Sequence, residues 1–138
     1  MIIDASVILA AFFPDEQQAE AQAVIGDYAA GRIALVAPSL LVYEVTNAIW
    51  QATRRGRITN EQAEAIMQAF EGIAILLEPV AWQPMMSLAR QFGRSAYDAA
   101  YLALAQEKRE PLVTGDLRLY NAVAPHLPWV QWIGDYRT

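Results

Sequence analysis

The sequence predicts an α/β protein in which a parallel sheet carries helices on both faces. Short apolar runs typical of buried strands alternate along the chain with longer segments of helical periodicity. Strands separated by helices favour parallel pairing, because the connecting helix returns the chain to the same end of the sheet. With 138 residues, 55% of them hydrophobic and 18% charged, the chain is long enough for one domain with a sizeable core.

The first predicted elements are a strand, two helical segments and a second strand. Met1–Asp4 is a short apolar run, and Ala5–Phe13 is a helical or turn segment that a following proline ends. A helix rich in Ala, Gln and Glu is predicted from Asp15 to about Ala30, where a glycine gives the stop signal. The run Ile33–Ala37 predicts the second strand.

Two helices with clear start signals come next. Ser39 is the expected N-cap of a helix over Leu40–Arg55, whose apolar residues form one stripe. Thr59–Gln62 has the pattern of a capping box and opens a helix that runs to about Gly72. Together these segments predict a helical hairpin.

The second half of the chain predicts three strands and three helices, punctuated by prolines and glycines. In order they are a strand Ile73–Leu77, a helix that follows Pro79 and Pro84 and ends near Gly93, a helix Ala96–Lys108, a strand Pro111–Thr114, a short helix Leu117–Ala122 and an edge strand Val130–Ile133. No internal repeat, low-complexity tract or linker divides the sequence, so we expect one domain over residues 1–138.

Asp98 is a single carboxylate in the otherwise apolar helix predicted over Ala96–Lys108. Apolar residues at positions 97, 100, 101, 104 and 105 follow the spacing of a core-facing helix, which holds Asp98 close to buried surface. Ser95 stands three residues earlier, so a capping box is a purely structural explanation of this acid. The other explanation is that Asp98 belongs to a cluster of functional carboxylates.

Four of the fifteen acidic residues are predicted to meet at the carboxyl ends of the strands, where sites form in parallel sheets. Asp4 follows the first strand, Asp116 follows the fourth, and Asp98 opens the helix that leads to that fourth strand. Asp4 and Asp116 have an alternative explanation as N-caps. Glu44 has none, because it lies in the second turn of a mostly apolar helix as a half-buried charge.

Converging carboxylates require cations, because their mutual repulsion raises their pKa values and destabilises the fold. Oxygen ligands without histidine or cysteine select Mg²⁺ or Mn²⁺, and the chain has one histidine and no cysteine. An ion of this kind binds phosphate oxygens and activates water, which is the chemistry of phosphodiester hydrolysis. The net charge of −5 argues against broad nucleic-acid binding but is compatible with such a metal site.

Four motifs in this order resemble the PIN-domain ribonucleases, most closely the VapC toxins of bacterial and archaeal toxin-antitoxin pairs. They are Asp4–Ser6 after the first strand, Glu44 with Asn47 in a helix, Tyr97–Ala105 and Leu112–Asp116. The resemblance covers nearly the whole chain. It implies a PIN-like three-layer α/β/α sandwich with a central, mostly parallel sheet, and the activity of a metal-dependent endoribonuclease.

The resemblance also implies roles for single residues and partners. The metal site and catalytic centre would consist of Asp4, Glu44, Asp98 and Asp116, and its polar support of Ser6, Asn47 and Thr114. The cofactor would be Mg²⁺ or Mn²⁺. The implied partners are an RNA substrate drawn from transfer or ribosomal RNA, a VapB-like antitoxin whose tail blocks the site, and a second copy in a homodimer. Attack by an activated water would leave a 5′-phosphate and a 3′-hydroxyl.

One departure from the family concerns the number of metal ions. Many relatives carry a further acid shortly after the last motif, whereas Asp116 is followed by Leu117, Arg118 and Leu119. Two rival functions also remain: a non-catalytic PIN-like binding module that acts through a protein partner, and a Mg²⁺-dependent phosphotransfer domain. The phosphatase form of the latter needs an aspartate where Ser6 stands.

Candidates for contact with RNA lie outside the four motifs. Arg90 and Arg94 precede the Ala96–Lys108 helix and are placed to hold a phosphate near the metal. For Arg54, Arg55 and Arg57, favourable charge at a helix C-terminus is preferred over RNA contact. Base stacking is open to the aromatic residues Tyr43, Trp50, Trp82, Trp129 and Trp132, although core or dimer contacts are preferred for most of them.

The first residues carry no targeting signal. Met1 leads at once into Ile2, Ile3 and Asp4, without a basic segment followed by an apolar stretch. No apolar run reaches the roughly 18 residues of a membrane span. We therefore expect a cytoplasmic protein without membrane contact.

Overall fold

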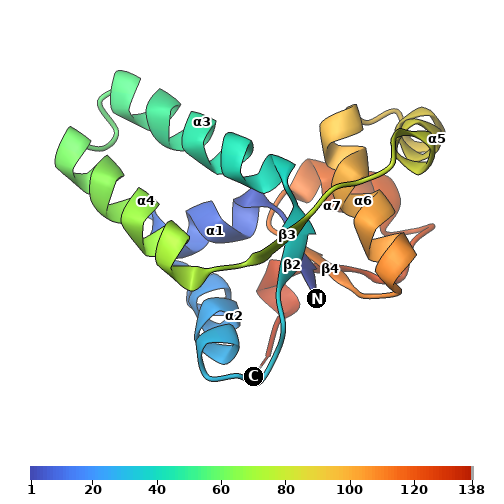
Figure 1. Cartoon of the computed structure of the whole chain (residues 1–138), viewed down its shortest axis with the longest axis horizontal. Coiled ribbons are helices and arrows are strands. Elements are labelled where there is room, and N and C mark those ends of the chain that lie inside the picture. Colours follow the sequence, from blue (N-terminus) through green and yellow to red (C-terminus); the bar gives the residue numbers. More distant parts are fainter. Residues whose placement is uncertain (138) are drawn as a thin grey trace.

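The computed structural model describes residues 1–137 and contains a five-stranded parallel sheet with the strand order β3-β2-β1-β4-β5 (Figure 1). Every pair of neighbouring strands runs in the same direction. The strands are β1 (Ile2–Ile3), β2 (Val36–Pro38), β3 (Leu76–Glu78), β4 (Leu112–Thr114) and β5 (Val130–Trp132). The predicted α/β class and central parallel sheet are confirmed.

Helices cover both sides of this sheet. Helices α1 to α4 lie on one side, with α3 and α4 as a projecting hairpin, and α5 and α6 lie on the other (Figure 1). The helices are α1 (Ala5–Phe12), α2 (Ala19–Ala29), α3 (Leu40–Arg54), α4 (Asn60–Ile73), α5 (Trp82–Phe92), α6 (Ala96–Lys108) and α7 (Leu117–Val123), followed by the 3₁₀ turn η1 (Ile133–Asp135). None of the helices in residues 1–137 is long and apolar enough to span a membrane.

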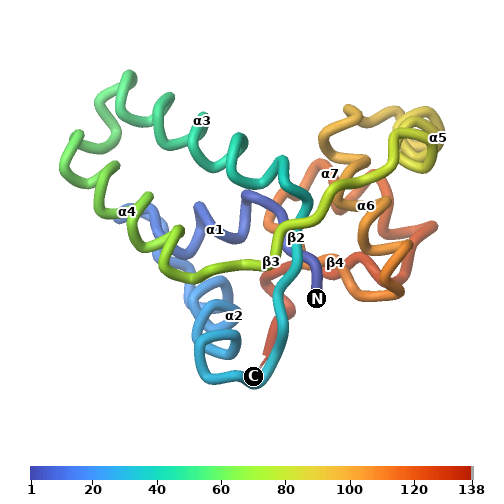
Figure 2. Tube along the Cα trace, in the orientation of Figure 1, coloured from blue at the N-terminus to red at the C-terminus, as the bar shows by residue number. Residues whose placement is uncertain are grey.

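β1 is the central strand of the sheet. The strands that follow it are added first on one side, as β2 and β3, and then on the other side, as β4 and β5. Ile2 pairs with Val36 of β2 on one side and with Leu112 of β4 on the other. The chain first moves outward from β1 to β2 and β3, and then crosses back through α5 and α6 to β4 (Figure 2). Ligands of open parallel sheets bind where the strand order reverses, outside the carboxyl ends of the strands. In this chain that point lies between β1 and β4.

The predicted helix over Asp15–Ala30 begins too early, because the structure starts α2 at Ala19. Asp15 and Glu16 lie in a turn, where both carboxylates bind the guanidinium of Arg57 at 2.8 and 2.7 Å. Gln17 then has a positive φ of 41°, a left-handed conformation that interrupts helical geometry. A contact with a distant arginine therefore overrides the local helix signal.

Two predicted strands are displaced toward the C-terminus. The second runs over Val36–Pro38 instead of Ile33–Ala37, and the third over Leu76–Glu78 instead of Ile73–Leu77. The third strand starts later because α4 continues through Ile73 and ends at Ala74, which has a left-handed φ of 56°. Alanine at this position gave no stop signal, whereas Gly72 inside the helix gave a false one.

α6 is the best-buried helix of the fold. Every residue from Ala99 to Ala105 is buried, because one face packs on β1, β2 and β4 while α5 covers another. The alternating small alanines allow this close approach from two sides. The sequence predicted a single core-facing stripe, and α6 instead lies as a buried helix between the sheet and α5.

Asp27 connects α2 to the C-terminal segment of the chain. Its side chain is buried and accepts hydrogen bonds from the Tyr136 hydroxyl and from Nε of Arg32, the latter at 2.8 Å. The Tyr136 hydrogen bond and, to a smaller extent, Arg32 hold the pKa of Asp27 below its ordinary value. A carboxylate with a lowered pKa stabilises the folded state only while it is ionised.

We therefore expect Asp27→Asn to lower the melting temperature by a few degrees at neutral pH. The stabilisation exists above the unfolded-state pKa of about 4 and is lost as the pH falls through the lower pKa of the folded protein. Melting curves of both proteins between neutral and acidic pH test this, and the two melting temperatures should converge in acid. A difference that stays constant over this range would contradict it.

Candidate functional site

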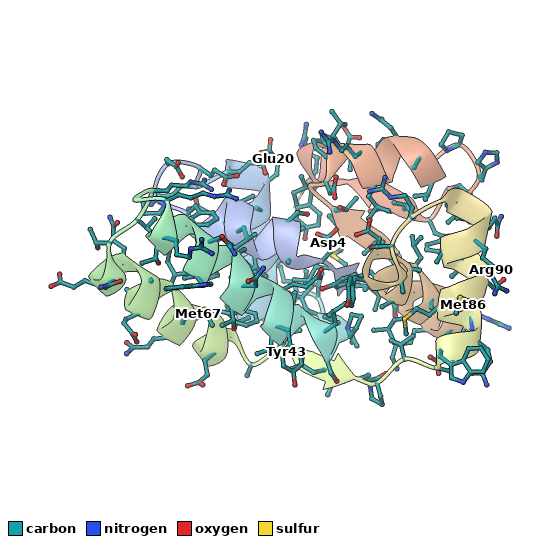
Figure 3. All side chains as sticks on the ribbon, turned by 90° about the horizontal axis from the view of Figure 1, so that it is seen from above. Asp4, Glu20, Tyr43, Met67, Met86 and Arg90 are labelled. Carbon is teal, nitrogen blue, oxygen red and sulfur yellow. The ribbon has the colours of Figure 1, made fainter. Side chains whose placement is uncertain are left out.

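The candidate site lies at the reversal point of the sheet, where β1 and β4 end. Asp4 directly follows β1 and is the N-cap of α1, with its carboxylate accepting from the Ser6 amide at 3.1 Å. The side chain is almost fully buried, at 6% exposure. Figure 3 views the molecule from above, with Asp4 between the helices of the two sides. The N-cap explanation of Asp4 is thus correct, but it does not account for the burial.

Two hydroxyl groups hold the Asp4 carboxylate. Ser6 Oγ donates to Oδ1, and Thr114 Oγ1 donates to Oδ2 at 2.5 Å from the end of β4. The same hydroxyl oxygens accept from the following turn: Ser6 Oγ from the Gly115 amide at 2.7 Å, and Thr114 Oγ1 from the Asp116 amide at 3.0 Å. Each hydroxyl therefore has a fixed orientation, and Asp4 is locked between β1 and β4.

Gly115 gives this turn the space it needs. A Cβ atom at this position would lie 3.2 Å from Ser6 Oγ, tighter than ordinary van der Waals contact. Asp116 follows and caps α7, accepting from the amides of Arg118 and Leu119 at 3.0 and 3.2 Å through Oδ1. The N-cap explanation of Asp116 is also correct, and it occupies only one of the two carboxylate oxygens.

Burial dominates the electrostatics of Asp4. The pKa of Asp4 is raised to about 6 in total: removal from water raises it most, the hydrogen bonds from the Ser6 and Thr114 hydroxyls oppose the shift, and the negative charge of Asp116 adds to it. The buried carboxylate and Asp116 therefore repel each other. Bringing a positive charge between them would relieve both the desolvation and the repulsion.

Glu44 belongs to a second pair of acids. Its Oε1 accepts from the hydroxyl of Tyr101 at 2.6 Å, a contact that joins α3 to α6. Partial burial raises the pKa of Glu44, the Tyr101 hydrogen bond opposes the shift, and the charge of Asp98 adds to it. The pKa of Tyr101 is raised well above its ordinary value, mainly by burial and then by Glu44, with smaller effects of Asp4 and Asp98.

Asp98 lies at the start of α6 with an arginine beside it. Its Oδ2 accepts from Nε and from the terminal nitrogen of Arg94 at 3.2 and 3.0 Å. The Ser95 hydroxyl accepts from the Asp98 amide at 3.0 Å, so the cap is present. The carboxylate is bound by Arg94, however, and the capping-box explanation accounts for only half of the arrangement. A cation at Asp98 would have to compete with Arg94 for this oxygen.

The remaining candidates lie further out. Asn47 is on the exposed face of α3 and makes no side-chain hydrogen bond within residues 1–137. Arg90 is exposed in the last turn of α5 and points away from Asp4 in Figure 3. Within residues 1–137, neither side chain makes a hydrogen bond or an ion pair with these carboxylates. Arg94 is near them, but it is engaged with Asp98.

The donor chemistry of the site fits a hard divalent cation, although the side chains do not yet converge. In the part of the chain that the structure describes, no three Asp, Glu or His side chains stand together in a geometry that holds a metal. The acids instead form two pairs, Asp4 with Asp116 and Glu44 with Asp98, which are coupled through their charges. Their oxygen-only donors suit Mg²⁺ or Mn²⁺.

Two residues of the site lie inside the motifs but were given no functional role. Tyr101 was interpreted as a core residue of the apolar stripe, and Gly115 as a residue of a turn. A signal for Tyr101 was present, because a buried tyrosine hydroxyl usually has a hydrogen-bond partner. Nothing in the sequence pointed to Glu44 as that partner, since 57 positions separate the two residues.

Comparisons with known proteins agree on one family. A family model described as the PIN domain matches residues 1–124. Ribonuclease VapC3 of Pyrobaculum aerophilum is 29% identical over 86% of this chain and 91% of its own length. VapC ribonuclease Mb0985 of Mycobacterium bovis is 32% identical over 93% of this chain and 94% of its own length. Ribonuclease VapC9 of Mycobacterium tuberculosis matches to the same extent.

A solved structure has the same fold. The crystal structure of PAE2754 from Pyrobaculum aerophilum matches with a TM-score of 0.73, covering 96% of this chain and 88% of that chain at 23% identity. Similarity at this level of identity concerns the fold alone.

We expect Tyr101→Phe to lower the free energy of unfolding by about 1–2 kcal/mol, because Glu44 loses its buried donor. Urea unfolding with an unchanged m value measures this loss. The matched control is Tyr97→Phe on the same helix, where the tyrosine is 64% exposed. It should change the free energy by less than about 0.5 kcal/mol. Equal effects of the two substitutions would contradict the role of the Tyr101–Glu44 hydrogen bond.

Proposed function

The chain belongs to the PIN-domain family, with VapC ribonucleases among its relatives, and on that premise we propose that it is a metal-dependent endoribonuclease toxin. The cofactor we propose is Mg²⁺ or Mn²⁺, and the reaction is hydrolysis of RNA phosphodiester bonds. By resemblance to the family, transfer or ribosomal RNA is the proposed substrate. A VapB-like antitoxin would neutralise the activity.

The observation that carries this proposal is the presence of two mutually repelling acid pairs near the reversal point of the sheet, with Tyr101 close to both pairs. Asp4 is buried against the charge of Asp116, and Glu44 is half-buried against the charge of Asp98. Repulsion between carboxylates destabilises a fold unless a cation binds between them. We propose that these four acids hold the divalent ion. When bound, such an ion supplies charge neutralisation for the phosphate and lowers the pKa of a water.

The chain's own residues would prepare the site in distinct ways. Ser6 and Thr114 fix both oxygens of Asp4, so this carboxylate needs no reorganisation. Tyr101 fixes Oε1 of Glu44, and Oε2 would be left to bind the ion. Arg94 pairs with Asp98 in the described structure and, once released by a cation at Asp98, would be free to bind the RNA phosphate.

The proposed reaction is an in-line hydrolysis. A water releases one proton to the solvent as its oxygen attacks phosphorus, the bond from phosphorus to the ribose 3′-oxygen breaks, and that 3′-oxygen takes up a proton from the solvent. The products are a 5′-phosphate and a 3′-hydroxyl, because the ribose 2′-hydroxyl takes no part in the attack.

Protein partners are proposed on a different surface. A groove of about 450 Å³ lies between α3, α4 and the edge strand β3, with Val42, Met67, Phe70 and Leu77 in its wall. Leu76 and Leu77 of the edge strand are exposed next to it. Exposed apolar patches and uncovered strand edges are typical of protein contacts. We propose that the second copy of a homodimer and the antitoxin bind around this region, and that the antitoxin's tail extends from it to block the candidate site.

We expect purified protein to cut RNA in Mg²⁺ or Mn²⁺, and to stop when EDTA removes the metal. Asp98→Asn should lower the rate by about a hundredfold or more, since even partners of metal ligands contribute roughly 10- to 100-fold. Glu107→Gln is the matched control, because Glu107 is an exposed acid on the same helix. It should cleave like the parent.

Sequencing of the fragment ends tests the chemistry of the same reaction. A 2′,3′-cyclic phosphate would contradict hydrolysis by water. Folded, metal-loaded protein that cuts no transfer, ribosomal or total RNA would favour the alternative function, a non-catalytic PIN-like module that acts through a protein partner.

A further inference from the structure

The solvent-facing side of α3 carries an unusual row of side chains. Tyr43, Asn47, Trp50 and Arg54 follow one another at spacings of four, three and four residues. Residues with these spacings lie on one face of a helix. We call this row the α3 stripe. It lies opposite the buried face of α3, which consists of Leu41, Val45, Ile49 and Ala52.

The two aromatic rings of the α3 stripe are exposed without a structural need. Tyr43 is 73% exposed and Trp50 is 55% exposed. Neither is a member of the hydrophobic core or a side chain packed against it. Exposed aromatic rings present flat apolar faces to water, so they are candidates for binding another flat, apolar group.

The outer end of the α3 stripe is positively charged. The guanidinium of Arg54 lies 5.9 Å from the centre of the Trp50 ring. Arg54 and its neighbour Arg55 have no carboxylate partner within residues 1–137, whereas Arg57 binds both Asp15 and Glu16. In a chain of net charge −5, these two arginines therefore remain available for an anionic partner.

The inner end of the α3 stripe lies beside the candidate site. Tyr43 directly precedes Glu44, whose carboxylate joins α3 to α6. Figure 3 shows Tyr43 near the start of α3, at the lower edge of the view, with Asp4 nearer the centre. From Tyr43 to Arg54 the helix rises by roughly 16 Å. That length spans about four or five stacked nucleotides at roughly 3.4 Å each.

We propose that the α3 stripe is a docking track for a single-stranded segment of the RNA that enters the candidate site. This inference rests on the proposed function and names the surface that holds the unpaired strand. Bases stack on Tyr43 and Trp50, Asn47 hydrogen-bonds a base edge between them, and Arg54 binds a phosphate. Paired bases in a duplex are stacked on each other, so their faces are not available to these rings.

The chemistry of the α3 stripe favours RNA over a protein partner. The apolar side chains suited to protein contact lie around the groove beside Val42, on a different face of the helix. The neighbours of Trp50 on the solvent side are instead polar or charged, namely Thr46, Asn47 and Arg54. Isolated rings separated by polar groups and followed by free guanidinium groups match the alternation of bases and phosphates in a single strand.

The test measures RNA binding by the whole chain with the substitution Asp98→Asn, which prevents cleavage of the probe during the measurement. The probes are a fluorescein-labelled, mixed-sequence single-stranded oligoribonucleotide and the same strand annealed to its complement, followed by anisotropy. Trp50→Ala should weaken single-strand binding about five- to tenfold, and Trp50→Phe should restore most of it. Arg54→Gln should reduce the slope of log affinity against log salt by about 0.7, the value for one phosphate contact.

Matched controls separate the α3 stripe from general surface effects. Trp82 on α5 is 66% exposed, so Trp82→Ala removes a comparable ring elsewhere. Arg109 is exposed and has no carboxylate partner in the described chain, so Arg109→Gln removes a comparable charge. Both controls should bind like the parent, and the duplex should bind more weakly than the single strand.

Cleavage by the otherwise unsubstituted protein distinguishes the two proposals. The effect of Trp50→Ala should fall on KM, because uniform binding of the strand is lost. If RNA is cut but Trp50→Ala and Arg54→Gln change neither affinity nor KM, the docking track is wrong and the nuclease stands. If Trp50→Ala leaves RNA affinity intact but alters the oligomeric state in light scattering, the stripe is a protein interface. Absence of both cutting and binding refutes the proposed function itself.

Discussion

The candidate site depends on one carboxylate, that of Asp4, which is buried where the strand order of the parallel sheet reverses. Asp4 is enclosed between β1 and β4, with both oxygens held by hydroxyl groups and the charge of Asp116 nearby. Burying a charged group is costly unless it is paired, and hydroxyl donors compensate only partly. The structure therefore retains a locally unfavourable group at the position where open α/β sheets bind ligands. A divalent cation would convert this cost into binding energy.

The second acid pair shows how separate parts of the chain are joined around that point. α3 brings Glu44 and α6 brings Asp98, and Tyr101 holds the two helices in register through one hydrogen bond. Arg94 occupies Asp98 and supplies the positive charge that the resting protein otherwise lacks there. Among the described residues the four acids do not converge on one point, so the metal site that we propose requires their oxygens to move closer together.

Much of the fold, and the places of three of the acids along it, could be predicted from the sequence, because the strands, helices and N-caps of this chain have local signals. Asp4, Asp98 and Asp116 stand beside strand ends and helix starts, and the alternation of elements was enough to expect them on one edge. The boundaries that were predicted wrongly have two causes. Arg57, a distant partner, holds Asp15 and Glu16 in a turn, and Ala74 ends α4 in a left-handed conformation that alanine does not signal. Tyr101 and Arg94 were unpredictable in their roles, since side-chain partners across helices leave no pattern in the sequence.

Thermal unfolding with and without divalent metal tests the central claim, that these acids form a cation site. At a metal concentration of about 100 times the dissociation constant, the folded state should gain about 2.7 kcal/mol, a rise of several degrees in melting temperature. Asp4→Asn should lose this rise, whereas Glu107→Gln, which changes an exposed acid away from the site, should keep it. An equal rise in both proteins, or none in the parent, would contradict the account.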